Sequence, residues 1–276
     1  MVTRTDYNQM GVKAAYSVML EIIRILGEYK GNMVLIGGWV PQLLFQNTGE
    51  LHTGSIDVDL AFDHKRITDD TYKTIHELLL ERDYVQGDQP FTFHRKVNID
   101  GNEVAVKVDL LSGEYEGTGK SHRHQKVQNI RARKVRGCDL AFNDPIEVTI
   151  EGNLPGGAQD STIIRVSSIV PFLIMKAIVL DDRIKEKDAY DIYFCLKQYE
   201  DRLDELVDEF RPHLENGLIQ EGLHKLAKNF ETEEHIGPKF VADFEEITDE
   251  EDRAQIQRDA FEAQIISCGN WVLYEQ

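Results

Sequence analysis

The spacing of apolar residues changes along this chain of 276 residues, and the change falls near residue 167. Before that point, alternating apolar and polar positions separated by turn residues predict strands. These strands are predicted at 55–62, 91–99, 103–111, 145–154 and 161–166, with a short buried strand at 33–36. In the same part, helical spacing predicts helices at 11–28, 39–45 and 69–82.

After residue 167 the apolar residues recur three and four positions apart, which is typical of amphipathic helices. Helices are predicted at 170–181, 187–198, 203–214, 218–227 and 249–266. We therefore expect an α+β protein. An α/β domain with a mixed sheet flanked by helices is predicted over residues 1–166, followed by a helical domain over residues 167–276.

Two aspartates, Asp57 and Asp59, share one face of the strand predicted at 55–62. Because residues i and i+2 of a strand project from the same face, about 6 to 7 Å apart, their carboxylates repel one another. A shared divalent cation removes that repulsion, and carboxylate oxygens suit Mg²⁺ or Mn²⁺. Ordinary aspartates on a half-exposed strand are the alternative interpretation.

The strand predicted at 103–111 repeats this arrangement. Its alternating valines face the core, so Lys107 and Asp109 lie on the opposite face. If this strand lies beside the first, Asp109 becomes the third carboxylate of the site. Three aspartates that clamp two metal ions suit in-line attack on a phosphoryl group.

Two further features lie close to these aspartates in sequence. Gly37 and Gly38 follow a buried strand and precede a helix, so their backbone amides can approach a phosphate group. Ser55 lies on the same face as Asp57 and can hydrogen-bond a phosphate. A simple tight turn and an exposed polar residue are the alternatives. Trp39 is predicted to lie in the core, and His52 at the surface.

The chain resembles the polymerase-β-type nucleotidyltransferases in three segments: Leu35-Ile-Gly-Gly-Trp-Val-Pro, Thr53-Gly-Ser-Ile-Asp-Val-Asp and Val106-Lys-Val-Asp. That family has a glycine-containing turn, a strand with two aspartates, and a third aspartate on a later strand. The resemblance implies a nucleotidyltransferase fold. It also implies that Asp57, Asp59 and Asp109 hold Mg²⁺ or Mn²⁺, with a nucleoside triphosphate as substrate.

The helical part carries a second resemblance. Lys176 in Leu173-Ile-Met-Lys-Ala-Ile-Val-Leu, and the run Lys187-Asp-Ala-Tyr-Asp, are similar to the lysine-bearing helix and KDxxD motif of AbiEii-type nucleotidyltransferases. These are toxins of type IV toxin–antitoxin and phage-abortive systems, and Lys107 also agrees with them. The resemblance implies a partner antitoxin.

Helical spacing gives the second motif a physical meaning. Asp188 and Asp191 share a helical face, and Lys187 can pair with Asp191. Lys176 and Lys187 are predicted to neutralise triphosphate charge, while either aspartate positions a lysine or accepts a proton from the acceptor hydroxyl. An exposed helix with ordinary salt bridges is the alternative.

The net charge of −18 argues against a broadly basic nucleic-acid binder. The charge is uneven, however, because the segment from Lys120 to Arg136 is basic and contains no acidic residue. This segment is the candidate strip for binding an RNA acceptor.

The chain has no apolar run of the roughly 18 to 20 residues that a membrane span needs, and its N-terminus does not resemble a secretory signal. With three widely spaced cysteines that are predicted to stay reduced, the protein is predicted to be cytoplasmic.

We expect the active site in a cleft between the two domains, where NMP is transferred from an NTP to a hydroxyl of RNA, such as a tRNA end, or of a protein. Two other functions stay open. The first is a nucleotidyltransferase of the aminoglycoside-modifying kind, which the net negative charge favours because its small-molecule substrates are polycations. Lys176 and the KDxxD motif argue against it. A nucleotide-binding or interaction module without catalysis is the second alternative, and the three intact aspartates speak against it.

Overall fold

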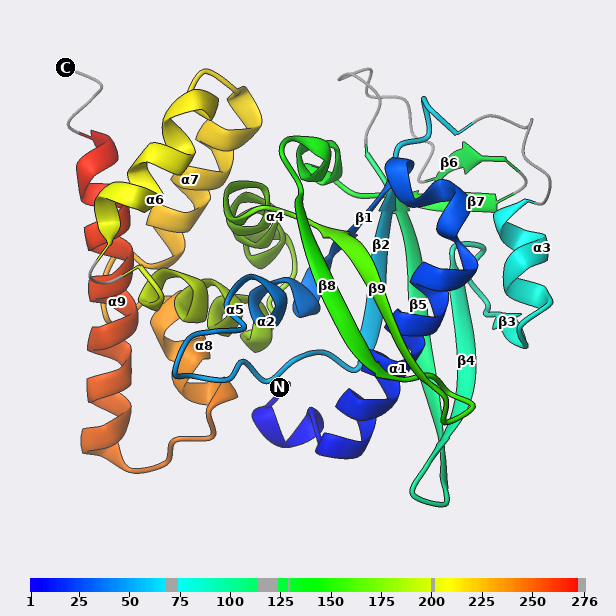
Figure 1. Ribbon diagram of the computed structural model, residues 1–276. Helices are drawn as coiled ribbons and strands as arrows, with labels where there is room; N and C mark the ends of the chain where they lie inside the picture. Colours follow the sequence, from blue (N-terminus) through cyan, green and yellow to red (C-terminus); the bar gives the residue numbers. More distant parts are fainter. Residues whose placement is uncertain (68–73, 114–123, 129, 200–201, 273–276) are drawn as a thin grey trace. The chain divides into compact units, whose positions relative to one another are not determined.

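A computed structural model describes residues 1–67, 74–113, 124–128, 130–199 and 202–272 (Figure 1). The chain forms two compact units. The α/β unit comprises Tyr7–Leu44 and Gly54–Ser168, and the helical unit comprises Met1–Asp6, Phe45–Thr53 and Ile169–Gln276. The sequence analysis had assigned the two short N-terminal segments of the helical unit to the α/β domain.

The α/β unit is built on a mixed sheet of mostly antiparallel strands, with the order β3-β4-β5-β2-β1-β9-β8 and β7 attached to β5. In the described part of the chain the strands are β1 Met33–Ile36, β2 Asp57–Phe62, β3 Tyr84–Gln86, β4 Thr92–Ile99, β5 Asn102–Ser112, β6 His124–Val127, β7 Ile130–Lys134, β8 Ile146–Asn153 and β9 Gln159–Val166. The two predicted hairpins, β4–β5 and β8–β9, are confirmed. Strands β3, β6 and β7 were not predicted.

Helix α1, Gln9–Ile25, covers one face of this sheet (Figure 1). Its apolar positions recur at helical spacing, and Ala15, Met19 and Ile22 are completely buried. Asn8 caps the helix, because its side chain accepts a hydrogen bond from the backbone N–H of Gly11. The helix contacts β4 and β5 as well as β8 and β9, so it ties both hairpins to one core.

The helix predicted at 69–82 is shorter than expected. Helix α3 is Ile75–Leu80, and Thr74 and Glu77 form a capping box at its start. This cap fixes the first turn at Ile75, so the predicted start at residue 69 is wrong for this helix. Residues 68–73 lie outside the described residues.

The helical unit contains α4 Ile169–Asp182, α5 Glu186–Lys197, α6 Leu203–Phe210, α7 Gly217–Asn229, α8 Ile236–Phe244 and α9 Glu250–Val272. Helix α4 is apolar on nearly every side and packs against α5 and α7. Helix α8 was not predicted, because Gly237-Pro238 indicates a turn. Proline is tolerated in a first helical turn, and a Cβ at Gly237 would lie 2.6 Å from the Phe230 ring.

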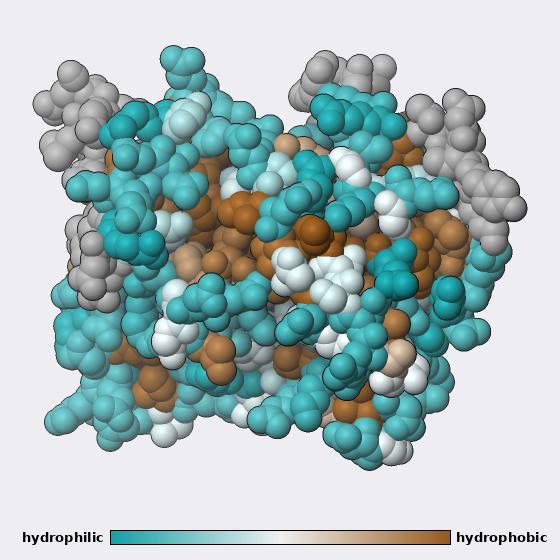
Figure 2. All heavy atoms as spheres, viewed as in Figure 1, coloured by the Kyte–Doolittle hydropathy of each residue, from teal (hydrophilic) through white to brown (hydrophobic). Residues whose placement is uncertain are grey.

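Hydrophilic residues cover much of the face shown in Figure 2, as the net charge of −18 leads one to expect. Among the described residues, no helix is both long enough and apolar enough to cross a membrane.

Candidate functional site

The three aspartates predicted for the metal site lie on neighbouring strands of the α/β unit. Strand β2 pairs with β5 in parallel, with Asp59 opposite Asp109 and Asp57 opposite Lys107. Because paired residues of adjacent strands project from the same face, all four side chains share one face of the sheet. We call this group the carboxylate face. The four side chains meet only because β5 pairs with β2 in this register, which the sequence did not predict.

Short hydrogen bonds orient the carboxylates. Ser55 Oγ donates to Asp57 Oδ1 at 2.5 Å, and Thr92 Oγ1 donates to Asp109 Oδ1 at 2.6 Å. Ser55, predicted to contact nucleotide, therefore binds an aspartate in this structure. Thr92 was missed by the sequence analysis, and the only signal for it is its register opposite Asp109 in the β4–β5 hairpin.

Lys107 supplies a positive charge to the carboxylate face. Its Nζ lies 2.8 Å from Asp109 Oδ2 and 3.9 Å from Asp57 Oδ2. Burial lowers the pKa of Lys107, but the hydrogen bond and charge of Asp109, with the charges of Asp57 and Asp59, raise it above its usual value. Lys107 is therefore a stable ammonium that partly offsets the repulsion between the aspartates.

The chemistry of this face fits a divalent cation, since three carboxylates provide hard oxygen ligands around a position that already stabilises an ammonium group. Within the described residues, no three His, Cys, Asp or Glu side chains form a group that could hold a metal ion. The three aspartates therefore fit a divalent cation in the chemistry of their oxygen atoms and in the sheet face that they share.

The glycine turn lies directly against the carboxylate face. Gly37 has φ of +75°, and a Cβ placed there would lie 2.2 Å from Asp59 Oδ2. Only glycine allows both this left-handed backbone and this close approach. Gly38 and Trp39 are buried in the same turn, and the Trp39 indole donates to the backbone carbonyl of Asp57 at 2.8 Å. The core position predicted for Trp39 is confirmed.

We expect Gly37→Ala to displace the Asp59 carboxylate. Gly101→Ala is the matched control, because Gly101 also has positive φ, of +85°, and a Cβ there meets nothing within 4 Å. Both variants should lose about 1 kcal/mol of unfolding free energy from backbone strain. Gly37→Ala should lose about 1 to 3 kcal/mol more through overpacking, measured by urea denaturation. Equal losses in the two variants would mean that the contact with Asp59 is not tight.

The predicted residues of the helical part form a second, buried group inside the helical unit. Lys176 lies on α4, Lys187, Asp188 and Asp191 lie on α5, and His52 comes from the segment Phe45–Thr53. We call these five residues the lysine–aspartate cluster. Each is at most 9% exposed, so the alternative of an exposed, salt-bridged helix is wrong.

Each charge of the cluster has a partner of opposite sign. Lys176 Nζ lies 2.7 Å from Asp188 Oδ1 and 2.6 Å from Asp191 Oδ2. Lys187 Nζ lies 2.6 Å from Asp191 Oδ1, confirming the expected i, i+4 pair. Arg183 Nε adds a contact of 3.1 Å to Asp188 Oδ2. Charges buried this deeply persist only when they are paired.

The two lysines differ in their titration. Burial lowers the pKa of Lys176, yet Asp188 and Asp191 together raise it above its usual value. Burial also lowers the pKa of Lys187, and because the charge of Lys176 adds to this effect, Asp191 and Asp188 do not reverse it and the net shift is downward. Burial raises the pKa of Asp191, but the two lysines hold it well below its usual range. The carboxylate of Asp191 is therefore the centre of the cluster.

The surface role predicted for His52 is wrong. Its ring is stacked on Tyr190 with a centroid distance of 5.3 Å, and its Nε2 lies 2.9 Å from Asp191 Oδ1. Its partner is 139 residues away in sequence, so no local pattern could have identified it.

The stability of the helical unit should depend on pH through His52. Burial and the charge of Lys187 lower the pKa of His52 from 6.5 to about 4, although Asp191 opposes this shift. A depressed folded-state pKa contributes stability that is present above pH 6.5 and is lost as the pH falls through about 4. His52→Gln should therefore lose less stability than wild type over this interval, by up to about 3 kcal/mol. Urea denaturation at several pH values measures this, with exposed His224→Gln as the control, and parallel curves for wild type and His52→Gln would contradict it.

The predicted basic strip is partly described. Strands β6 and β7 form a hairpin, and β7 pairs with β5 so that Arg133 lies opposite Leu111. Because Leu111 is two residues beyond Asp109 on β5, strand alternation places Arg131 and Arg133 on the carboxylate face. Both arginines are exposed. Residues 120–123 and 129 of the strip lie outside the described residues.

Comparisons with protein-family models, with curated proteins and with solved structures found no match to this chain.

Proposed function

We propose that the chain is a cytoplasmic, metal-dependent nucleotidyltransferase that transfers NMP from a nucleoside triphosphate to an acceptor hydroxyl and releases pyrophosphate. The observation that carries the proposal is the register of β2 and β5, which brings Asp57, Asp59 and Asp109 onto one face. Three carboxylates from two adjacent strands, beside a glycine turn, form the donor set that phosphoryl transfer requires.

Each residue of the carboxylate face has a proposed role. Asp57, Asp59 and Asp109 would hold Mg²⁺ or Mn²⁺, which would supply positive charge to the phosphoryl group under attack. Lys107 is proposed to contact the phosphates with its ammonium group, which lies 2.8 Å from Asp109 Oδ2, and Gly37 and Gly38 are proposed to offer them their backbone amides. Ser55 and Thr92 hold two of the carboxylates in orientation through their hydrogen bonds.

The lysine–aspartate cluster has a proposed role in the helical unit. Lys176 and Asp191 are proposed as catalytic residues, and Lys187 and Asp188 as nucleotide contacts, on the basis of the resemblance to AbiEii-type enzymes. Their mutual ion pairs support a preformed arrangement in which Asp191 fixes both ammonium groups. The location of the active site in a cleft between the two domains stays a prediction, as do the toxin role and the antitoxin partner.

RNA is the proposed acceptor class. The exposed Arg131 and Arg133 support it, because they share the carboxylate face and can contact an acceptor backbone. The net charge of −18 favours a different acceptor, a polycationic small molecule, and keeps that alternative in the test.

The test is label transfer from each of four α-labelled NTPs. Purified protein is incubated with Mg²⁺ or with a chelator, and with total RNA, a protein extract or aminoglycosides as acceptors. Labelled RNA that disappears with the chelator and in Asp57→Ala supports the proposal with an RNA acceptor. Label on the aminoglycoside alone identifies the small-molecule enzyme. NTP binding without pyrophosphate release in any mixture identifies the non-catalytic module and overturns the proposal.

A further inference from the structure

The sheet face that carries the three aspartates continues onto β4 and β3. His94 of β4 lies opposite Lys107 of β5, and Val85 of β3 lies opposite His94. Paired residues of neighbouring strands project from the same face, so Lys107, His94 and Val85 form one row across three strands. Val85 is 64% exposed and His94 is half-buried, so this end of the row is open to solvent.

The contacts of two neighbouring residues agree with this placement of His94. Thr92, two residues earlier on β4, donates a hydrogen bond to Asp109 on the carboxylate face. Arg95, the next residue along, instead donates to Glu21 of α1, which covers the opposite face of the sheet. Because strand residues alternate between the two faces, His94 faces the same side as Thr92.

The imidazole of His94 is open to a further contact. It forms no hydrogen bond or ion pair with the part of the chain that the structure describes. A Cβ at Gly87 would lie 3.0 Å from His94 Nε2 and 3.5 Å from Thr92 Cγ2, so the ring lies beside the threonine that holds Asp109. Histidine rings are among the side chains on which the unstacked bases of single-stranded RNA stack.

Arg133 lies on the same side of β5 as His94. Strand β2 occupies the other side of β5, where Ala61 pairs with Leu111. Strand β7, which sets Arg133 opposite Leu111, therefore continues the position of β4. The guanidinium carbon of Arg133 lies 5.8 Å from the centroid of the Phe91 ring, directly before β4, which agrees with this arrangement.

Three rows of side chains therefore cross β5 in succession, each with one residue of β5 and one of β4 or β7. The rows are Lys107 with His94, Asp109 with Thr92, and Leu111 with Arg133. Successive rows are about 6 to 7 Å apart. The Asp109 row is thus flanked by an open aromatic ring on one side and by an exposed guanidinium group on the other.

The order of the strands indicates from which side an acceptor would reach Asp109. The glycine turn that follows β1 is proposed to hold the phosphates, and β1 lies beyond β2, on the far side from β4. In-line displacement places the attacking and the leaving oxygen on opposite sides of the phosphorus atom. A pyrophosphate that leaves on the β1 side requires an acceptor hydroxyl on the β4 side.

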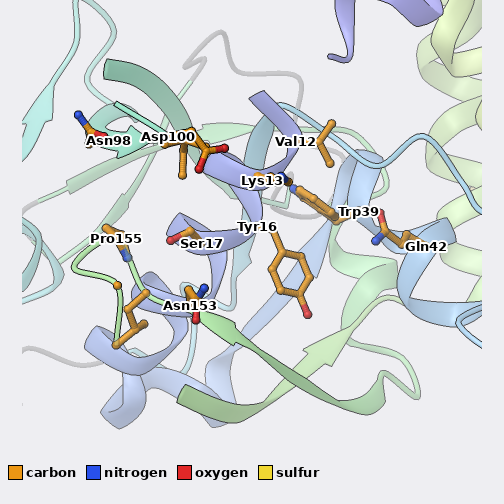
Figure 3. Close-up of a pocket in the computed structure, with 13 residues that line it drawn as sticks. Val12, Lys13, Tyr16, Ser17, Trp39, Gln42, Asn98, Asp100, Asn153 and Pro155 are labelled. Carbon is orange, nitrogen blue, oxygen red and sulfur yellow. The ribbon is translucent and has the colours of Figure 1, made fainter. Parts of the chain in front are cut away.

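This side of the sheet is distinct from the pocket of about 620 Å³ shown in Figure 3. That pocket is lined by residues of α1, of α2 (Val40–Leu44) and of the β4–β5 and β8–β9 turns. His94, Asp109 and Arg133 do not line it. A ligand on the three rows therefore does not occupy this pocket.

We propose that the three rows bind the terminal nucleotide of a single-stranded RNA acceptor, an inference that rests on the proposed function. The terminal base would stack on the His94 ring, and the ribose with its attacking hydroxyl would lie over Asp109. The 5′ phosphate of that nucleotide would pair with Arg133. Base and 5′ phosphate extend from opposite sides of a ribose, as His94 and Arg133 flank the Asp109 row.

Fluorescence anisotropy tests the stacking contact. A short single-stranded RNA with a fluorophore at its 5′ end is titrated with protein in Mg²⁺ and without NTP. His94→Ala should weaken binding by about tenfold, and His94→Phe, which keeps a flat ring, should recover most of that loss. His76→Ala is the matched control, because His76 is a half-buried histidine of the same unit that lies on α3.

An RNA that lacks only its terminal base identifies the group that His94 contacts. Wild type should bind this RNA as weakly as His94→Ala binds the intact RNA, and His94→Ala should not weaken its binding further. An equal further loss in the variant would mean that His94 acts elsewhere and would overturn the stacking contact.

Salt dependence tests the phosphate contact. Arg133→Gln should weaken RNA binding and reduce the slope of log K against log salt concentration by about 0.7, the value for one phosphate of a single strand. Arg82→Gln, at an exposed arginine of the same unit, should leave the slope unchanged. Equal slopes for wild type and Arg133→Gln would overturn this contact.

The site as a whole is overturned if wild type does not bind the RNA with a Kd below about 1 mM. It is also overturned if His94→Ala weakens binding of Mg-NTP and leaves RNA binding unchanged, because the row would then hold the nucleotide donor. Since no NTP is present in the RNA titrations, they do not depend on NMP transfer. The expected losses of RNA binding without label transfer in any mixture would support the site and overturn only the proposed function.

Discussion

Asp57→Ala is expected to reduce NMP transfer by at least about 10² to 10³-fold under saturating NTP and Mg²⁺. The substitution removes one of three carboxylates on the carboxylate face and leaves Asp59 and Asp109 opposite one another. In the proposed reaction, two carboxylates would hold a divalent cation more weakly than three, and the phosphoryl group would lose the charge stabilisation that the cation would supply. Label transfer measures the loss directly.

The fold should survive this change, because the Asp57 side chain is 29% exposed and the substitution removes only the hydrogen bond from Ser55 and the contact with Lys107. Far-UV circular dichroism should match wild type, and the unfolding free energy should fall by no more than about 1 to 3 kcal/mol. Asp88→Ala is the control, since Asp88 is an exposed aspartate of the same unit. Wild-type activity in Asp57→Ala would exclude the carboxylate face as the active site.

Asp191→Asn is expected to lower the unfolding free energy by about 3 to 5 kcal/mol. Asp191 is completely buried and pairs with both Lys176 and Lys187. The amide keeps the volume of the side chain but removes the charge, so two buried ammonium groups lose a partner that they share. Urea denaturation followed by far-UV circular dichroism measures the change.

Asp208→Asn is the control within the helical unit. Asp208 pairs with Arg211 at 2.5 Å, but both side chains are at least 60% exposed, so this substitution should cost no more than about 1 kcal/mol. Adding Lys187→Met to Asp191→Asn should recover part of the loss, because it removes a buried ammonium group that the Asp191 carboxylate had neutralised. If Asp191→Asn costs no more than Asp208→Asn, the cluster is not buried in solution.

The sequence predicted most of the local structure. Alternation placed Asp57 and Asp59 on one strand face, and helical spacing gave α1, α4 and α5 to within a few residues. These features were readable because a strand or an amphipathic helix imposes its own period on neighbouring residues. The start of α3 was not predicted, because it is set by the cap that Thr74 forms. Helix α8 was not predicted, because Gly237 lies in its first turn, where it contacts the Phe230 ring.

Tertiary structure decided how these elements combine. Asp59 lies opposite Asp109, which is 50 residues away in sequence. The buried His52 contacts Asp191, which is 139 residues away. A strand's period fixes which face a side chain takes, but not which strand lies beside it or how far it is shifted. The sequence by itself therefore determined which side chains share a strand face or a helix face, and packing between distant segments decided which of them meet.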